Sequence, residues 1–335
     1  MMQKSTNETI LRRIANTLIL NTSEVRTMGL PDGKMGVAVF LFYYARFIDN
    51  RYEEYADQLI EELTGEIQKI RQPNYADGLA GVGAGIEHLI QHGFIEGDSN
   101  EVLEDFDKLI HHTVSYFSGR IDIRNGITGY GKYYNIRLNN PNNYKKNNPH
   151  TEPVKEHLIR IVDLLSASYN TYEDIYSVIN FLPDVIDLDI NREKACAFFY
   201  YAVDLLETTV CEDEFFGNYP KTFNPLIAAV LLFNASVKIN DNDLAARALY
   251  FLDRYESGFR LHLSEKHAIK WAFLYHTLWK ICNRDIYKEL SAQWMEKITD
   301  DSLNFEHENL ITSGMMLLSM NNSINDDWLN CFPLH

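Results

Sequence analysis

A glycine-rich turn that leads straight into an apolar helix recurs along this chain and constrains its fold more than any other feature. The clearest copy is residues 77–90 (DGLAGVGAGIEHLI), with related stretches at 30–41 and 125–134. Each copy reads Gly-x-x-Gly, and the second glycines, Gly36, Gly81 and Gly129, are spaced by 45 and 48 residues. Self-similarity at such a period is typical of stacked repeat architectures.

The period continues after the glycines become rare. A step of about 46 residues predicts further junctions between a turn and an apolar helix near 175, 222, 268 and 314. Each place carries a polar stretch followed by an apolar run, and amphipathic segments lie between them at 191–208, 241–254 and 284–298. No stretch has the alternating pattern of a strand. The sequence therefore predicts an all-α fold of about seven helical hairpins.

Two arrangements of seven hairpins are open, a solenoid and a closed ring. The helix after each turn is apolar on nearly all sides, as an inner barrel of helices would be, which favours the ring. We expect one domain over residues 1–335, with the turns gathered at one mouth. The glycines are expected to allow positive φ and close backbone approach. They do not form a phosphate loop, because the Gly-Lys-Ser/Thr that follows such a loop is missing.

Charge and cysteine content exclude several classes of partner. The net charge is −16, from 47 acidic and 31 basic residues, which argues against a nucleic-acid partner and against an anionic membrane surface. No apolar run reaches the length of a membrane span, and residues 1–14 lack the pattern of a secretory signal. The four cysteines show no Cys-x-x-Cys spacing. We therefore expect a cytoplasmic protein with reduced thiols.

The glycine turns resemble those of the lanthionine synthetase C-like (LanC-like) family. Residues 78–83 (GLAGVG) match the family's Gly-Leu-x-Gly-x-Gly turn, and residues 125–134 (NGITGYGKYY) look like its third-repeat version. The match is specific over residues 28–135 and only periodic thereafter. The resemblance implies an α/α toroid, a double-layered barrel of seven inner and seven outer helices. It also implies a peptide substrate whose cysteine thiol adds to a dehydrated residue.

The resemblance further implies a zinc ion that activates the thiol, held by a Trp-Cys motif in the fifth repeat and a Cys-His-Gly motif in the sixth. Here the fifth repeat reads NYPKTFNP over residues 218–225, and Ser264 and Glu265 stand at the Cys-His places of the sixth. The family's fourth-repeat histidine is also missing. We therefore expect no zinc and no other cofactor. Asp122 resembles the third-repeat aspartate that handles protons in the family, and it is the candidate catalytic residue.

Polar residues that precede the inner helices are the candidates for a binding site at the mouth. For Asp32, Asp77 and Asp174 the plain interpretation is helix capping. Two histidines and several carboxylates in repeats six and seven could instead bind a metal or act as acid and base, or could form a solvated rim. The predicted mouth-binding residues are Lys221, Ser264, Glu265, His267, Glu306 and His307, and Arg124 and Glu308 lie beside them.

Three functions compete. The first is a zinc-less LanC-like protein that binds a peptide or a partner protein at the mouth without cyclase chemistry. The second is an active enzyme in which Asp122 works with Glu265 or Glu306, as paired carboxylates do in glycosidases. The third is a non-catalytic scaffold with a filled central channel. The content of the central cavity and the separation of the carboxyl groups discriminate among them.

Overall fold

The computed structural model describes residues 2–70, 72–116, 119–140, 151–165, 171–216, 225–258, 265–298, 310–321, 323–332 and 334. Within these ranges all regular structure is helical, so the all-α prediction is confirmed. Contacts divide the chain into two compact units. Unit 1 comprises residues 1–99 and 262–332, and unit 2 comprises residues 100–261 and 333–335. The single domain over 1–335 stays a prediction.

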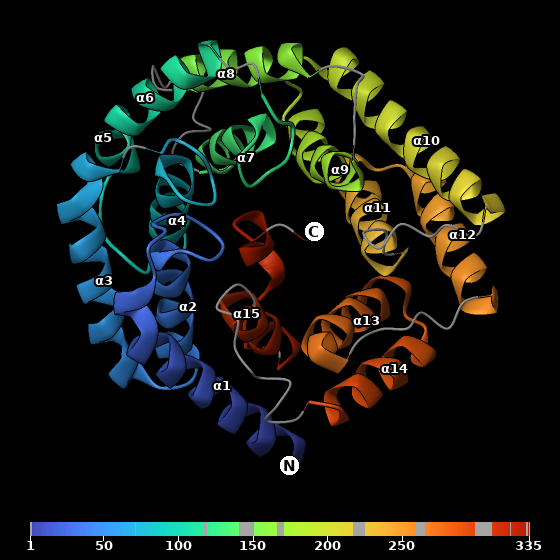
Figure 1. Ribbon diagram of the computed structural model, residues 1–335, viewed down its shortest axis with the longest axis horizontal. Coiled ribbons are helices and arrows are strands. Elements are labelled where there is room, and N and C mark those ends of the chain that lie inside the picture. Colours follow the sequence, from blue (N-terminus) through green and yellow to red (C-terminus); the bar gives the residue numbers. More distant parts are fainter. Residues whose placement is uncertain are drawn as a thin grey trace. The chain divides into compact units, whose positions relative to one another are not determined.

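Unit 1 holds the first two repeats and the last two (Figure 1). Its longer helices are α1 (Met2–Asn21), α2 (Lys34–Phe47), α3 (Glu53–Glu66), α4 (Leu79–Gln91), α13 (Ala268–Cys282), α14 (Asp285–Glu296) and α15 (Leu310–Met320). Its short helices are η1 (Thr22–Glu24), η2 (Asn50–Tyr52), η3 (Ile67–Lys69), η4 (Glu265–His267) and η6 (Asp326–Asn330).

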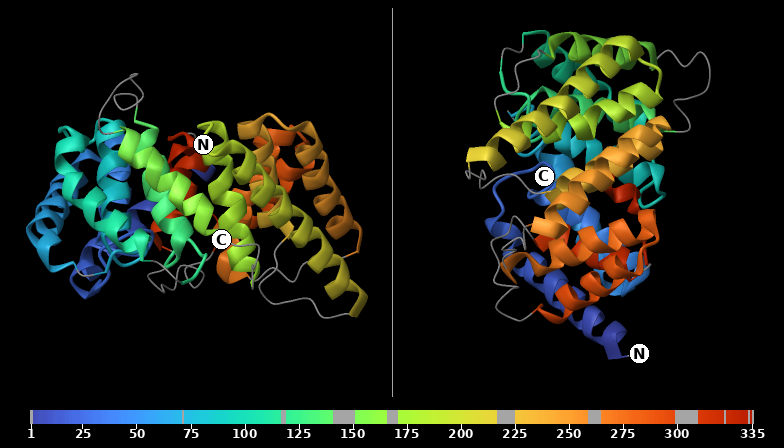
Figure 2. Two further views of the ribbon diagram at one scale, coloured as in Figure 1. Left: turned by 90° about the horizontal axis from the view of Figure 1, so that it is seen from above. Right: turned by 90° about the vertical axis from the view of Figure 1, so that its right-hand side faces the viewer.

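Unit 2 holds the middle repeats. Its helices are α6 (Glu104–Ser115), α7 (Ile127–Leu138), α8 (Thr151–Leu164), α9 (Tyr172–Asp187), α10 (Arg192–Phe216), α11 (Pro225–Ile239) and α12 (Asn242–Gly258). The short α5 (Ser99–Val102) begins at the last residue of unit 1 and precedes α6. Figure 2 shows these helices from two further sides, where α10, the longest at 25 residues, runs along the outside of unit 2.

Each unit has two layers because two kinds of helix alternate along the chain. Helices such as α2, α4 and α7 are buried along nearly their whole length. Helices such as α3 bury a single stripe, here Ala56, Leu59 and Leu63. A helix that is apolar all round must be covered on all sides, whereas an amphipathic one can face solvent. We call the first kind inner helices (α2, α4, α7, α9, α11, α13 and α15) and the second kind outer helices.

The repeat period predicted from the sequence is confirmed. Inner helices were expected near 175, 222, 268 and 314, and α9, α11, α13 and α15 begin at 172, 225, 268 and 310. The ends of the outer helices differ by a few residues from the amphipathic stretches. The amphipathic stretch expected over 191–208, for example, forms α10, which continues to Phe216. Within the described ranges, none of the helices combines the length and the apolar character that a membrane span requires.

The first two glycine turns are hydrogen-bonded to each other. Met28 N donates to Asp77 O over 3.4 Å and Leu30 N to Tyr75 O over 3.0 Å. A Cβ on Gly29 would lie 2.5 Å from Tyr75 O, and one on Gly81 would lie 2.5 Å from Leu30 N. Close backbone approach therefore explains these glycines. The expected positive φ is wrong for them, since Gly93 and Gly97 are the glycines with positive φ among the described residues.

Candidate functional site

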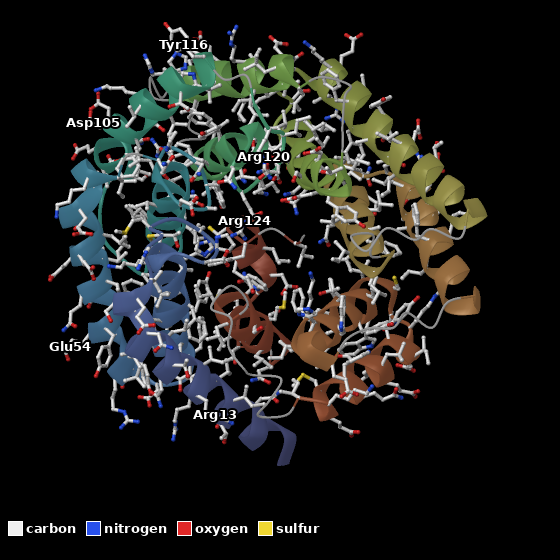
Figure 3. The ribbon with its side chains drawn as sticks, in the orientation of Figure 1. Arg13, Glu54, Asp105, Tyr116, Arg120 and Arg124 are labelled. Carbon is white, nitrogen blue, oxygen red and sulfur yellow. The ribbon has the colours of Figure 1, made fainter. Side chains whose placement is uncertain are left out.

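In each unit, the turns precede the inner helices, so the N-terminal ends of these helices lie on one side of the inner layer. We call this side the turn end of the unit. In unit 2 it carries the third turn, residues 120–126, and the start of α9. Figure 3 shows the side chains of Arg120 and Arg124 on the inner side of this region, whereas Asp105 and Tyr116 point outward from α6 and its C-terminal end. A hydrogen bond joins the third turn to α9, because Ile123 N donates to Ser177 Oγ over 3.2 Å.

Asp122 is buried at the centre of the third turn, with an exposed fraction of 1%. Its Oδ2 accepts from Arg120 Nε over 2.6 Å, and its Oδ1 accepts from Asn125 N over 2.8 Å. Both carboxylate oxygens are therefore hydrogen-bonded within the turn. A general base needs an oxygen within reach of the proton on its substrate. In this arrangement the carboxylate instead holds the turn and fixes one arginine.

That arginine is the solvent-facing group of the turn. The side chain of Arg120 is 64% exposed. The hydrogen bond that Arg120 donates to Asp122, followed by the charges of Asp122, Glu173 and Asp174, raises the pKa of Arg120 above its ordinary value. An arginine anchored at one nitrogen still has donors left for a carboxylate or a peptide carbonyl. The turn end of unit 2 therefore presents a positioned cation beside acidic residues.

The helix-capping interpretation is confirmed for Asp174. Thr171 is the N-cap of α9, and its Oγ1 accepts from Asp174 N while Asp174 Oδ2 accepts from Thr171 N, which is a capping box. It is wrong for Asp77, because the N-cap of α4 is Gly78 and Asp77 pairs with Asn74 inside the turn. Asp32 likewise precedes Gly33, the N-cap of α2.

The turn end of unit 1 contains two of the predicted binding residues. Glu265 is exposed and lies 3.4 Å from Lys297 Nζ, while the His267 ring meets Trp271 edge-on with centroids 6.2 Å apart. These contacts fix both side chains at the start of α13. Asp122 belongs to the other unit. The remaining predicted residues, Lys221, Ser264, Glu306 and His307, lie outside the described residues, and so does Glu308.

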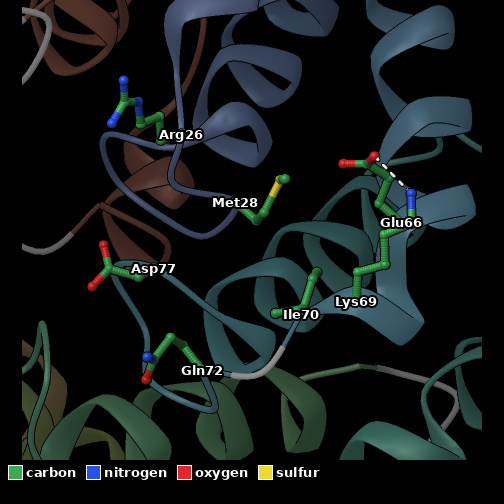
Figure 4. A pocket seen from close by; sticks show the side chains of 7 residues that line it. All are labelled: Arg26, Met28, Glu66, Lys69, Ile70, Gln72 and Asp77. Carbon is green, nitrogen blue, oxygen red and sulfur yellow. Dashed lines mark hydrogen bonds and ion pairs between the residues drawn. The ribbon is translucent and has the colours of Figure 1, made fainter.

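A cavity of about 200 Å³ opens at the turn end of unit 1, between the first two glycine turns and the end of α3 (Figure 4). Met28 and Ile70 supply its apolar lining, and the charged lining residues carry both signs and include an ion pair of 3.2 Å between Lys69 and Glu66. The lining residues are Arg26, Met28, Glu66, Lys69, Ile70, Gln72 and Asp77. Of these, sequence reasoning selected Asp77 alone. The other lining residues belong to no sequence motif. They come together because the first two glycine turns pair with each other.

Two buried ionic clusters in unit 2 were also not predicted. Asp184 on α9 accepts from Lys132 Nζ of α7 over 2.9 Å and from Lys238 Nζ of α11. Asp107 on α6 accepts from Tyr133 over 2.7 Å and from Arg137 over 2.9 Å. Each cluster joins neighbouring helices, and each sits within the layers. Both therefore serve the packing of unit 2, since buried charges must be paired.

The cysteines are spread over both units. Cys282 is the last residue of α13, Cys196 lies on the outer helix α10, and Cys331 is buried with its Sγ 3.8 Å from Ala84 O. Among the described residues no three His, Cys, Asp or Glu side chains are grouped as metal ligands. A zinc site of this kind needs thiolate and imidazole ligands around one point. The donors that the structure describes do not fit a zinc ion at the turn end.

Comparisons with known proteins agree with this geometry. A family model described as lanthionine synthetase C-like protein matches residues 24–177. Among solved structures, nisin cyclase is similar with a TM-score of 0.67 and 14% identity, over 96% of each chain. No curated protein matches the sequence.

The structural likeness shows the class of fold. This chain has the α/α toroid fold of nisin cyclase, as the repeat pattern and the resemblance predicted. The family-model match over residues 24–177 and this fold support the predicted resemblance to the lanthionine synthetase C-like family.

Proposed function

We propose that this chain binds a cysteine-bearing peptide at the turn end of its inner helices, within a peptide-modification pathway, and does not catalyse the cyclisation. The family and the fold support a role connected with peptide modification. The observation that carries the proposed lack of cyclisation is the burial and hydrogen bonding of Asp122. The residue that resembles the family's proton-handling aspartate is 1% exposed, and both of its oxygens accept hydrogen bonds.

The zinc chemistry of the family supports the same proposal. Zinc lowers the pKa of a bound thiol so that a thiolate is present near neutral pH. In this sequence Ser264 and Glu265 stand where the family has Cys-His. Glu265 is instead paired with Lys297, and Cys282 lies at the opposite end of α13. Because these residues do not fit zinc, we derive no step that passes through a metal.

The proposed role of the turn end is recognition. Arg120 is exposed and held at one nitrogen by Asp122, so little conformational entropy is lost when it binds a carboxylate or a peptide carbonyl. The paired-carboxylate enzyme is less well supported, because a buried and hydrogen-bonded Asp122 is poorly placed to exchange protons with a sugar. The scaffold alternative has one supporting observation, which is the burial of side chains from residues 323–332 against the inner helices of unit 1.

The experiment uses a synthetic peptide with one cysteine and one dehydrated serine. Binding is followed by fluorescence anisotropy, and cyclisation is followed by alkylating the remaining thiols before mass spectrometry. Addition of the thiol across the double bond leaves the mass unchanged, so alkylation is the readout that reports it. We expect saturable binding with full retention of the thiol. Thiol loss that depends on the chain would refute the proposal.

A matched pair of variants tests where the peptide binds. Arg120→Gln removes the positioned cation at the turn end, and we expect it to weaken binding about tenfold. Arg160→Gln removes an exposed arginine from the outer helix α8 and serves as the control. Equal effects of both variants would mean that the peptide is attracted by general charge only, and would remove the turn end from the proposal.

A further inference from the structure

Residues 323–332, which follow α15, lie against the inner helices of unit 1 on the side away from α3. Figure 1 shows them as the red ribbon beyond α15, next to α4. Three side chains are almost completely buried there. Trp328 and Cys331 are 0% exposed, and Phe332 is 1% exposed. We call this stretch the 323–332 segment.

The segment begins at the C-terminal ends of the inner helices. Asp326 accepts from Ser319 near the end of α15 and lies 3.6 Å from Lys280 Nζ near the end of α13. Asp327 lies 3.8 Å from His92 Nε2, at the C-cap of α4. These are long ion pairs between partly exposed groups, and such pairs contribute little to stability. The ion pairs of the first part are therefore weak, and its firmer attachment is the hydrogen bond that the buried Ser319 donates to Asp326.

The segment then runs along α4 and reaches the turn end. Cys331 Sγ lies 3.8 Å from Ala84 O in the middle of α4. Cys331 O accepts from Tyr75 Oη over 2.8 Å, and Tyr75 belongs to the second glycine turn. Five residues of chain thus span from His92 to the turn before α4. The segment, most of which is the short helix η6, packs against the inner layer along α4.

The contacts in the second part have the form of peptide recognition. Tyr75 is 1% exposed, and it donates to a backbone carbonyl, a bond that any residue at this position could accept. Burial raises the pKa of Tyr75 well above its usual range, so its hydroxyl stays a donor. The side-chain anchor is Trp328, whose ring centroid lies 5.6 Å from that of Phe273 on α13. Buried aromatic anchors are the usual hot spots of peptide binding.

The anchor itself is incompletely satisfied. Trp328 is fully buried, yet its indole Nε1 has no hydrogen-bond partner. An unpaired buried donor is destabilising, so Trp328 loses less on leaving this position than a fully hydrogen-bonded anchor would. The inner face between Tyr75 and Phe273 thus holds a peptide through one aromatic ring and one backbone carbonyl.

We propose that the 323–332 segment is an intramolecular peptide that occupies the partner site of this chain, and that a partner peptide binds by displacing it. The inference rests on the proposed function, since both assign a peptide to the turn end of the inner helices, and it concerns the turn end of unit 1. It also names the class of partner. The partner is a peptide that forms a short helical turn with an aromatic residue three positions before a cysteine, the spacing of Trp328 and Cys331.

The test uses the full chain and a fluorescein-labelled peptide with the sequence of residues 323–332, SINDDWLNCF, under reducing conditions. In the wild-type chain the segment competes with the probe. Trp328→Ala removes the anchor of the segment, and we expect it to tighten probe binding at least tenfold. A probe in which tryptophan is replaced by alanine is expected to bind neither chain.

Tyr287→Ala is the control. Tyr287 is 0% exposed and packs between α14 and α13, where its ring lies 6.3 Å from Tyr275, so its loss loosens unit 1 without touching the segment. Hydrogen exchange over residues 79–91 and 323–332 shows which variant has released the segment. The proposal is overturned if Trp328→Ala increases exchange in both stretches and the probe binds no more tightly than it does to the wild type.

A second variant covers the case in which Trp328→Ala does not fold. The double variant Asp326→Asn/Asp327→Asn removes the charges of both ion pairs at the start of the segment and keeps a side-chain oxygen at 326 that can accept from Ser319. We expect it to tighten probe binding about threefold, and unchanged binding would count against displacement.

Failure of this inference is distinguishable from failure of the proposed function. If Trp328→Ala binds the probe but no variant binds the peptide with cysteine and dehydrated serine, the displacement stands and the proposed function fails. If the wild-type chain binds that peptide while residues 323–332 remain fully protected from exchange, the proposed function stands and the displacement fails.

Discussion

Replacing Gly81 by alanine tests whether the recurring glycines exist for close backbone approach. A Cβ at this position would lie 2.5 Å from Leu30 N and closer still to Tyr75 O, where ordinary Cβ contacts begin near 3.4 Å. The two turns would have to separate by about 1 Å. Such overpacking costs about 1–3 kcal/mol. Loss of the hydrogen bond from Leu30 N to Tyr75 O adds about 1 kcal/mol.

Alanine also favours a helix over glycine by up to about 1 kcal/mol, which offsets part of this cost. We therefore expect Gly81→Ala to lower the free energy of unfolding by about 2 kcal/mol. Gly65→Ala is the matched control, because a Cβ there meets nothing within 4 Å on the outer helix α3. It should raise the free energy by about 0.5–1 kcal/mol.

Urea denaturation followed by far-ultraviolet circular dichroism measures both variants under the same conditions. The expected result is a lower midpoint for Gly81→Ala and an unchanged or higher midpoint for Gly65→Ala. A Gly81→Ala chain as stable as the wild type would refute the explanation by close approach.

Two further predictions concern buried charge. Asp184→Asn leaves the buried Lys132 without its counter-charge and should destabilise the chain by about 3–5 kcal/mol in the same urea titration, whereas Lys132→Met/Asp184→Leu should cost less. A double variant that costs more would contradict this. His88, buried and bonded to Tyr43 Oη, has its pKa lowered to about 3 by burial and then by His92. Since the unfolded chain binds that proton more readily, stability should fall as pH drops below about 6.5, by about 2 kcal/mol at pH 5. His88→Phe should flatten this dependence, and an unchanged slope would argue against it.

The sequence alone was sufficient to predict the repeat and its period. The inner helices are apolar on nearly all sides, and this pattern persists where glycines are absent, as at Pro225 and Ala268. The ends of outer helices were less predictable. Leu103, for instance, separates α5 from α6 although neither glycine nor proline stands at the break.

The candidate site was less predictable, since it depends on pairs that are not periodic. The position of Asp122 was suggested by a family motif, but its partners Arg120 and Asn125 follow from the turn geometry. The 323–332 segment carries no repeat signature, and its buried side chains are too few to show a period. Its course along α4 depends on a single backbone carbonyl and one aromatic contact. Neither can be read from a sequence pattern.

The central claim is that this LanC-like chain works without the zinc ion of the family. Its most direct test is the zinc content of the full chain, measured by elemental analysis after expression with added zinc and purification in metal-free buffers. The account predicts a content well below one zinc ion per chain. One tightly held zinc ion per chain would contradict it.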